Sequence, residues 1–220
     1  MIFYQTNQFM KNNLNIISNC CAGGYLYRDY LKIEYPNPFI WNFITASSMF
    51  NLIKHYNTIN FRNIELKKYN QVIKTQGHLT PRVYNTCTAL NIDNTFDVAF
   101  PHNIYNPNYN KPLIKGVDVH YRKPHELTYN NWLKRIGRMD QSRQPIYLLI
   151  TQQLIEFSYN NTLNILTNFP TDKIIVITAY KQLLKENTKS HKIIYLRDIE
   201  TSPAKVLTQC YQTIYGFIMN

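Results

Sequence analysis

Residues 146–180 read IYLLITQQLIEFSYNNTLNILTNFPTDKIIVITAY, and this stretch sets the architecture expected for the chain. It begins with one solid apolar run, 146–150, and ends with a second, 173–178, each as long as a buried strand. Between them, apolar residues recur at helical spacing over 154–166. A strand, a helix and a second strand in this order predict a crossover connection, which joins parallel strands.

The same alternation continues on both sides of this stretch. We expect further strands at 116–121 and 192–196, and further helices at 126–139 and 180–186. A final helix is well capped, because Ser202 stands at the expected N-cap and Pro203 at the first helical position. The prediction is an α/β fold, a single three-layer domain over residues 1–220 with a mainly parallel or mixed sheet flanked by helices.

The N-terminal half gives shorter signals. We expect a strand at 14–17 and helices at 25–31 and 49–56, the second capped by Ser47 or Ser48. The segment 57–110 is the least regular part of the chain. Short alternating runs at 71–74 and 96–100, among many turn residues, predict hairpins and loops there.

The composition is that of a basic globular protein. Lys and Arg number 24 against 13 Asp and Glu, which gives a formal net charge of +11, and 45% of the residues are hydrophobic. Such a surplus attracts nucleic acid, phosphate-bearing metabolites or an acidic membrane surface. The basic residues form no dense run and no nucleic-acid-binding motif. We therefore expect an anionic small-molecule or glycan substrate rather than a specific nucleic-acid sequence, and peripheral membrane contact stays open.

The cysteines and the first residues bear on the compartment. The cysteines, at 20, 21, 87 and 210, have the spacing neither of a disulfide framework nor of a zinc site. The chain shows no charged start followed by an apolar block, and no apolar segment approaches the roughly 20 residues that span a bilayer. These features predict a cytoplasmic protein without a transmembrane segment, and they name no cofactor and no metal ligands.

The turn after the first strand carries the most distinctive polar residues: Ser18, Asn19, Cys21, Gly23 and Gly24. A turn that opens a helix offers unpaired backbone amides, its glycines let a ligand approach the backbone, and the helix dipole favours a thiolate. Cys21 is therefore a candidate nucleophile or ligand contact. The alternative is a small buried side chain beneath the turn, because free cysteine is among the most buried residue types.

A cysteine nucleophile needs a base, and two histidines are candidates. His102 follows the Phe-Pro pair at 100–101. His120 ends the strand expected at 116–121, on the same face as Asp118. A carboxylate and an imidazole two residues apart can bind a metal, relay a proton or orient a hydroxyl-rich substrate. An ordinary solvent-facing edge strand would show the same pattern.

The helix expected at 126–139 carries Trp132 and a basic face. Lys134, Arg135 and Arg138 lie at i, i+1 and i+4, a spacing that can clamp a phosphate or diphosphate. A solvated basic face is the more common explanation of such a run.

Together, these segments resemble a bacterial family of exopolysaccharide-biosynthesis proteins of unknown molecular function. The family's Ser-Asn-x-Cys-x-Gly-Gly turn is matched at 18–24, and its Tyr-x-Ser-Pro-Phe segment at 35–39, with Asn37 in place of the serine. Its Asp- and His-bearing strand is matched by Asp118 and His120. Its Trp-x-(Arg/Lys)-Arg-x-x-Arg helix is matched at 132–138.

This resemblance implies a transferase-type protein of cell-surface or exopolysaccharide glycan biosynthesis. Lys134, Arg135 and Arg138 would hold the phosphates of a nucleotide-sugar-like donor in a cleft at the strand ends. Asp118 or His120 would serve as the base. The other substrate-binding candidates are Ser18, Asn19, Gly23, Gly24, Phe39, Trp41 and Trp132.

A weaker resemblance is to a family of papain-like cysteine peptidases, through Cys21, Pro38-Phe39-Ile40-Trp41 and Phe100-Pro101-His102. It implies a cysteine-dependent acyl hydrolase or acyltransferase, in which Cys21 attacks an acyl carbon and His102 or His120 takes its proton. A third hypothesis is a non-catalytic glycan- or polyanion-binding protein.

Overall fold

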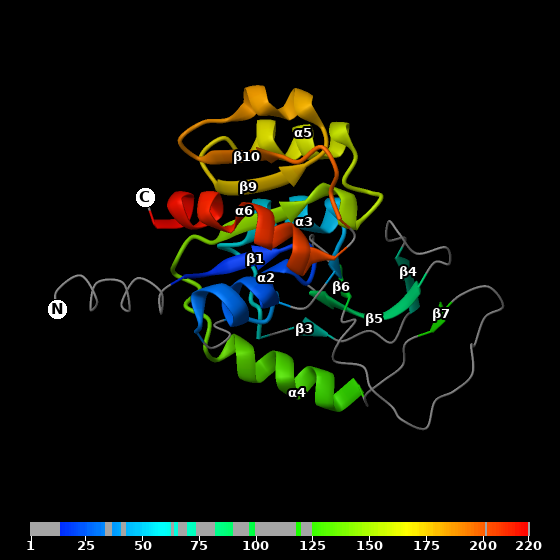
Figure 1. The fold of residues 1–220 in the computed structure, drawn as a ribbon. Coiled ribbons are helices and arrows are strands. Elements are labelled where there is room, and N and C mark those ends of the chain that lie inside the picture. Colours follow the sequence, from blue (N-terminus) through cyan, green and yellow to red (C-terminus); the bar gives the residue numbers. More distant parts are fainter. Residues whose placement is uncertain are drawn as a thin grey trace.

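A parallel sheet forms the centre of the computed structural model of this chain (Figure 1). The structure describes residues 14–33, 37–40, 43–62, 64–65, 70–73, 82–89, 97–99, 118–119, 125–200 and 202–219. In this part of the chain the sheet consists of β1 (Ile16–Ser18), β8 (Ile146–Ile150), β9 (Lys173–Thr178) and β10 (His191–Tyr195). These strands lie side by side in the order β1-β8-β9-β10, and every pair is parallel. The predicted α/β class is confirmed.

The strands are apolar on both faces because helices cover both. All residues of β8 are buried, and the side chains of successive residues enter opposite hydrophobic clusters. Tyr147 and Leu149 belong to one cluster, while Leu148 and Ile150 belong to the other. This arrangement is typical of parallel strands, which read as continuous apolar runs.

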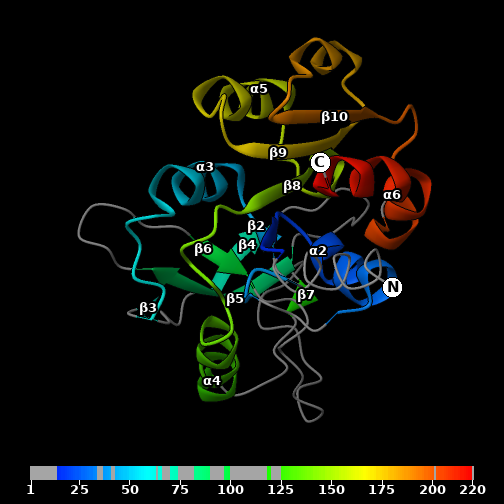
Figure 2. The same cartoon turned by 90° about the vertical axis from the view of Figure 1, so that its left-hand side faces the viewer.

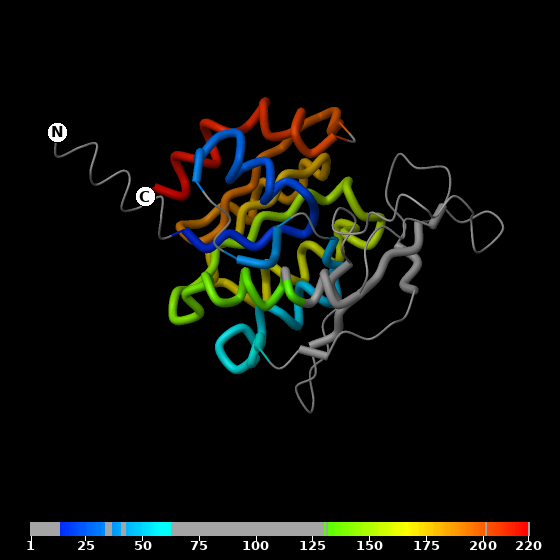
Figure 3. The backbone as a smooth tube through the Cα atoms, turned by 90° about the horizontal axis from the view of Figure 1, so that it is seen from below, coloured from blue at the N-terminus to red at the C-terminus, as the bar shows by residue number. Residues whose placement is uncertain are grey.

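The helices divide between the two faces of the sheet, as Figures 2 and 3 show. One face is covered by α2 (Ala22–Tyr25), by the π-helical segment η1 (Leu26–Leu31) and by α6 (Pro203–Met219). The other is covered by α3 (Ala46–His55), α4 (His125–Ile136), α5 (Tyr159–Asn168) and the 3₁₀ segment η3 (Lys181–Glu186). The result is a three-layer arrangement with two hydrophobic clusters.

A second, mostly antiparallel sheet lies beside the parallel one (Figure 1). Its main path runs β2 (Phe43–Ile44), β6 (Asp97–Ala99), β5 (Arg82–Ala89) and β3 (Ile64–Glu65). Two further strands, β4 (Asn70–Ile73) and β7 (Asp118–Val119), also pair with β5. The alternating runs at 71–74 and 96–100 thus correspond to β4 and β6, whereas β5 was not predicted.

Helix boundaries differ from the sequence predictions where side chains cap the backbone. The helix predicted at 154–166 begins only at Tyr159, because Ser158 accepts the backbone N–H of Asn161 and fixes the N-cap. The preceding residues include a 3₁₀ turn, η2 (Thr151–Gln153). Likewise, α3 begins at Ala46 and not at Met49, since Thr45 is its N-cap and accepts the N–H of Ser48.

Candidate functional site

The carboxyl ends of β1 and β8 are where the topology of the sheet favours a ligand site. The chain leaves β1 into α2 on one face of the sheet, and it leaves β8 towards α5 on the other face. Where neighbouring parallel strands send their next helices to opposite faces, a crevice opens at the strand ends, and α/β proteins bind ligands there. Residues 18–21 and η2 occupy this edge.

Asn19 joins the two strands at that edge. Its side-chain Nδ2 donates to the carbonyl of Ile150 at 3.1 Å, and its Oδ1 accepts the N–H of Ile150 at 2.9 Å. Its backbone N–H donates to Leu148, and its carbonyl accepts the N–H of Ile44. The buried amide therefore continues the β1–β8 ladder beyond Ser18 and ties β2 to it.

Gly23 lies against Ser18 and Phe39, next to the contact that Asn19 makes between β1 and β8. A Cβ added to Gly23 would lie 3.1 Å from the Cβ of Ser18 and 3.8 Å from the carbonyl oxygen of Phe39. The hydroxyl of Ser18 accepts the backbone N–H of Cys20. Gly23 thus lets α2 pack closely on β1, and Gly24 is buried beside it. Their predicted role in ligand binding stays a prediction.

Both cysteines of the turn are buried. Cys21 precedes α2 and is only 5% exposed, and Cys20 is fully buried. Burial raises the pKa of the Cys20 thiol to about 12. Burial also raises the pKa of the Cys21 thiol well above its ordinary value, and the neighbouring Cys20 raises it further. Both sulfurs are therefore protonated at neutral pH in this arrangement. Cys210 is buried in the face covered by α6, as predicted.

Phe39 and Trp132 belong to the hydrophobic cluster on the face covered by α3, α4 and α5. Their rings meet edge to face with centroids 5.2 Å apart, and the indole N–H donates to the carbonyl of Phe61. Trp132 is 2% exposed. The structure thus brings these two binding candidates together, but as side chains packed in the hydrophobic core.

The basic candidates lie at the other edge of the sheet. Lys134 and Arg135 stand in the last turn of α4, and Arg138 follows it shortly before β8 begins. The first residue of β8, Ile146, lies beside the start of β1, since it donates its N–H to the carbonyl of Asn15 at 2.8 Å. In Figure 1, α4 crosses below the sheet towards that edge. The structure does not bring these cations together with Cys21.

Other candidates fall wholly or partly outside the described residues. Asp118 is described only as backbone, in β7, where it pairs in parallel register with Arg82. His102, His120 and Trp41 lie outside the described residues. Their roles therefore stay predictions.

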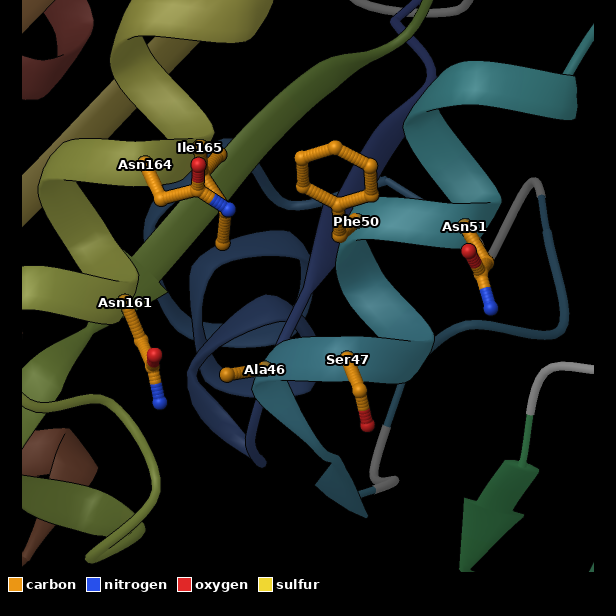
Figure 4. Close-up of a pocket in the computed structure, with 7 residues that line it drawn as sticks. All are labelled: Ala46, Ser47, Phe50, Asn51, Asn161, Asn164 and Ile165. Atoms are coloured by element: carbon orange, nitrogen blue, oxygen red, sulfur yellow. The ribbon is translucent and has the colours of Figure 1, made fainter.

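The structure reveals a pocket that the sequence did not indicate. It lies between α3 and α5, has a volume of about 280 Å³ and is shown in Figure 4. Its lining combines a hydroxyl, three carboxamides, one aromatic ring and two aliphatic side chains. The residues are Ala46, Ser47, Phe50, Asn51, Asn161, Asn164 and Ile165.

Several polar side chains of the pocket are held in place by neighbours. Asn161 donates from Nδ2 to the carbonyl of Glu156 at 2.8 Å, and the carboxamide oxygen of Asn164 accepts from Asn168 at 2.9 Å. The hydroxyl of Ser47 lies 3.2 Å from that of Thr45. A carboxamide has more donors and acceptors than one such bond uses, so these groups are oriented and still able to bind a ligand.

The pocket opens at the same edge of the sheet as the turn after β1. Its α3 side begins directly after Ile44, which donates to the carbonyl of Asn19. Its α5 side follows η2, which continues the chain from the end of β8. In the sequence, only the asparagine-rich segment 160–164 could have indicated this pocket. No pattern of residue types or spacing in α3 indicates that this helix forms the other wall.

Glu156 is a further residue that the sequence did not single out. It lies between η2 and α5, and its backbone carbonyl accepts a hydrogen bond from the side chain of Asn161. Although the residue as a whole is exposed, its carboxyl is partly withdrawn from water, which raises its pKa, and the nearby backbone of Ala46 opposes that rise.

Comparisons with models of protein families and with curated proteins found no match for this chain. Among the described residues, no three His, Cys, Asp or Glu side chains gather closely enough to hold a metal ion. None of the helices in the described ranges has both the length and the apolar character needed to cross a bilayer.

Proposed function

We propose that this chain is a transferase-type protein of cell-surface or exopolysaccharide glycan biosynthesis, which binds a phosphate-bearing, nucleotide-sugar-like donor at the carboxyl edge of the parallel sheet. The observation that carries the proposal is the pocket between α3 and α5. It combines a hydroxyl, carboxamides and an aromatic ring at the edge where α/β proteins bind ligands.

The chemistry of the lining suits a sugar. Each sugar hydroxyl both donates and accepts hydrogen bonds, and carboxamides and hydroxyls can do the same. Phe50, whose ring meets that of Phe169 edge to face at 4.9 Å, supplies an apolar wall for the C–H side of a sugar ring. At about 280 Å³ the pocket lies just below the range of about 300–1,000 Å³ that is typical of small-molecule sites, so it suits one sugar ring and not a whole nucleotide sugar.

The charge of the chain supports a phosphate-bearing ligand. A net charge of +11 raises the local concentration of anions near the surface. No Lys or Arg lines the α3–α5 pocket. The phosphates of the donor would therefore lie outside it, and Lys134, Arg135 and Arg138 remain candidates for contacts elsewhere.

The two alternatives have different support. A non-catalytic glycan-binding protein would use the same pocket, and only turnover separates it from a transferase. A cysteine-dependent acyl hydrolase or acyltransferase is less well supported, because burial raises the pKa of the Cys21 thiol and a nucleophilic cysteine must react as the thiolate.

Titration of UDP-glucose and UDP-N-acetylglucosamine, followed by ligand-observed NMR, tests the proposal. Asn164→Ala removes one exposed carboxamide of the pocket and should weaken binding about fivefold, the value of one hydrogen bond. The matched control is Asn160→Ala, an exposed asparagine of the same helix that does not line the pocket. Release of UDP in the presence of glycan acceptors then separates a transferase from a binding protein.

Two results would contradict the proposal. One is the absence of binding by the wild-type protein for either nucleotide sugar. The other is equal loss of affinity in the Asn164→Ala and Asn160→Ala variants, which would mean that the ligand lies elsewhere.

A further inference from the structure

The α3–α5 pocket offers a hydrogen-bond acceptor and a donor from the same side of α5. The Nδ2 of Asn161 donates to the carbonyl of Glu156, and within the described part of the chain its Oδ1 receives no hydrogen bond. The Oδ1 of Asn164 accepts from Asn168, and among the described residues its Nδ2 has no acceptor. Asn161 therefore presents an acceptor to a ligand, and Asn164 presents a donor.

The spacing of these two side chains suits an amide. Asn161 and Asn164 stand at i and i+3 of α5, where Cβ atoms on one face of a helix are about 5–6 Å apart. The N–H and the C=O of an acetamide point in opposite directions from two different atoms, whereas the donor and the acceptor of a hydroxyl share one oxygen. An acetamide can therefore reach both carboxamides at once, with its N–H on Asn161 and its carbonyl on Asn164.

An apolar surface lies beside the two carboxamides. Ile165, which directly follows Asn164, is 1% exposed, and Ala46 is 6% exposed. The partly buried ring of Phe50 packs against the same hydrophobic cluster. Figure 4 shows Asn164 and Ile165 on the side of α5 that faces Phe50. The methyl group of an acetamide can be buried against this surface, and a hydroxyl group in its place gives no such apolar contact.

We propose that the α3–α5 pocket recognises the acetamido group of an N-acetylhexosamine. Asn161 accepts a hydrogen bond from the amide N–H, Asn164 donates to the amide carbonyl, and the methyl group packs against Ile165 and Phe50. The inference rests on the proposed function, since it concerns the sugar part of the donor. It adds the substrate class: activated N-acetylhexosamines are preferred to activated hexoses.

UDP-N-acetylglucosamine and UDP-glucose form a matched pair of probes, because they share the nucleotide and both phosphates and differ only in the substituent on carbon 2 of the sugar. The wild-type protein should bind UDP-N-acetylglucosamine about tenfold more tightly, the combined value of one hydrogen bond and one buried methyl group. Isothermal titration calorimetry with each probe measures this ratio.

Asn164→Asp removes the Nδ2 donor but keeps the shape of the side chain and an oxygen for the bond from Asn168. The ratio of the two affinities should fall to about twofold or less in this variant, because the amide carbonyl loses its donor. The added charge repels the phosphates of both probes equally, so the ratio is not affected by it. Asn160→Asp adds the same charge to the same helix outside the pocket and should keep the wild-type ratio.

A second measurement needs only the wild-type protein, which covers the case in which Asn164→Asp does not fold. In saturation-transfer difference NMR with UDP-N-acetylglucosamine, the acetyl methyl protons should receive more saturation than the other protons of the sugar, because they lie against apolar side chains.

Three results overturn the inference: a wild-type ratio near one, a ratio that stays unchanged in Asn164→Asp, or an acetyl methyl signal weaker than those of the other sugar protons. In those cases the proposed function still stands if both probes bind and Asn164→Ala weakens their binding. Failure of the wild-type protein to bind either probe overturns both.

Discussion

Asn19 lies in a turn that suggests ligand chemistry, and the structure shows what its side chain does in the fold. Its side-chain carboxamide hydrogen-bonds to both the N–H and the carbonyl of Ile150, as a backbone residue of a neighbouring strand would. A buried carboxamide paired in this way is expensive to remove, because two backbone groups would lose their partners. A polar residue at a strand end can thus have a structural role in strand pairing, and its residue type alone does not indicate ligand binding.

Cys21 gives the prediction at this scale, which concerns its reactivity. Burial raises the pKa of its thiol well above the ordinary value, and Cys210 is shifted by the same cause to about 12. We therefore expect slow alkylation by iodoacetamide at Cys20, Cys21 and Cys210 in the folded protein at pH 7.5, and fast alkylation in denaturant. Peptide mass spectrometry after timed quenching measures each rate separately.

The control for this experiment is internal, since Cys210 is a buried cysteine of the core. Alkylation of Cys21 that is much faster than that of Cys210 without denaturant would contradict the expectation. Such a result would favour the cysteine-dependent hydrolase or acyltransferase over the proposed glycan function.

At the scale of elements, the contact between α2 and β1 depends on Gly23. An added methyl group would lie 3.1 Å from the Cβ of Ser18, closer than most real contacts, and both residues are buried. Gly23→Ala should therefore lower the free energy of unfolding by about 1–3 kcal/mol, the usual cost of overpacking, despite the better helix propensity of alanine. Urea unfolding followed by circular dichroism measures the change.

Gly216 is the matched control, because it lies within α6 and an added Cβ meets nothing within 4 Å. Gly216→Ala should raise the free energy of unfolding by about 0.5–1 kcal/mol, since only the helix propensity changes. If both variants shift stability in the same direction, close packing is not the reason for a glycine at position 23.

The elements differ in how well the sequence predicted them, for a physical reason. The strands at 146–150 and 173–178 match the prediction residue for residue, because strands buried on both faces leave a continuous apolar run. Helix starts depend on single hydrogen bonds, such as the one that Ser158 accepts from Asn161, and periodicity does not reveal these. The strand β5 was missed because its residues, RVYNTCTA, form neither a continuous apolar run nor a strict alternation of apolar and polar residues.

At the scale of the whole molecule, the candidate site needs segments that are far apart in the chain. The turn at 18–24 stands out by its residue types alone, and its role in ligand binding stays a prediction. The α3–α5 pocket does not stand out in this way, because it joins residues 46–51 to residues 161–165, and only the folded topology brings them together. The basic helix illustrates the opposite case, since Arg138 has suitable chemistry but follows α4 shortly before β8 begins, at the other edge of the sheet.

The stability of the whole protein should depend on pH through carboxyl groups that folding desolvates. Partial burial raises the pKa of Asp172 above its ordinary 3.8, and the positive charge of His191 opposes that rise. A carboxyl with a raised pKa binds protons more tightly in the folded state than in the unfolded state. It therefore costs stability at neutral pH, and the cost disappears as the pH falls through the raised pKa towards 3.8.

Asp172→Asn removes this cost, so the variant should be more stable than the wild-type protein at pH 7, and the difference should vanish as the pH approaches 3.8. Urea midpoints measured at several pH values for both proteins test this. Asp198→Asn is the control, because Asp198 is exposed and its removal should change the midpoint little at any pH. A variant that is less stable than the wild-type protein at pH 7 would mean that the attraction between Asp172 and His191 outweighs the desolvation of the carboxylate.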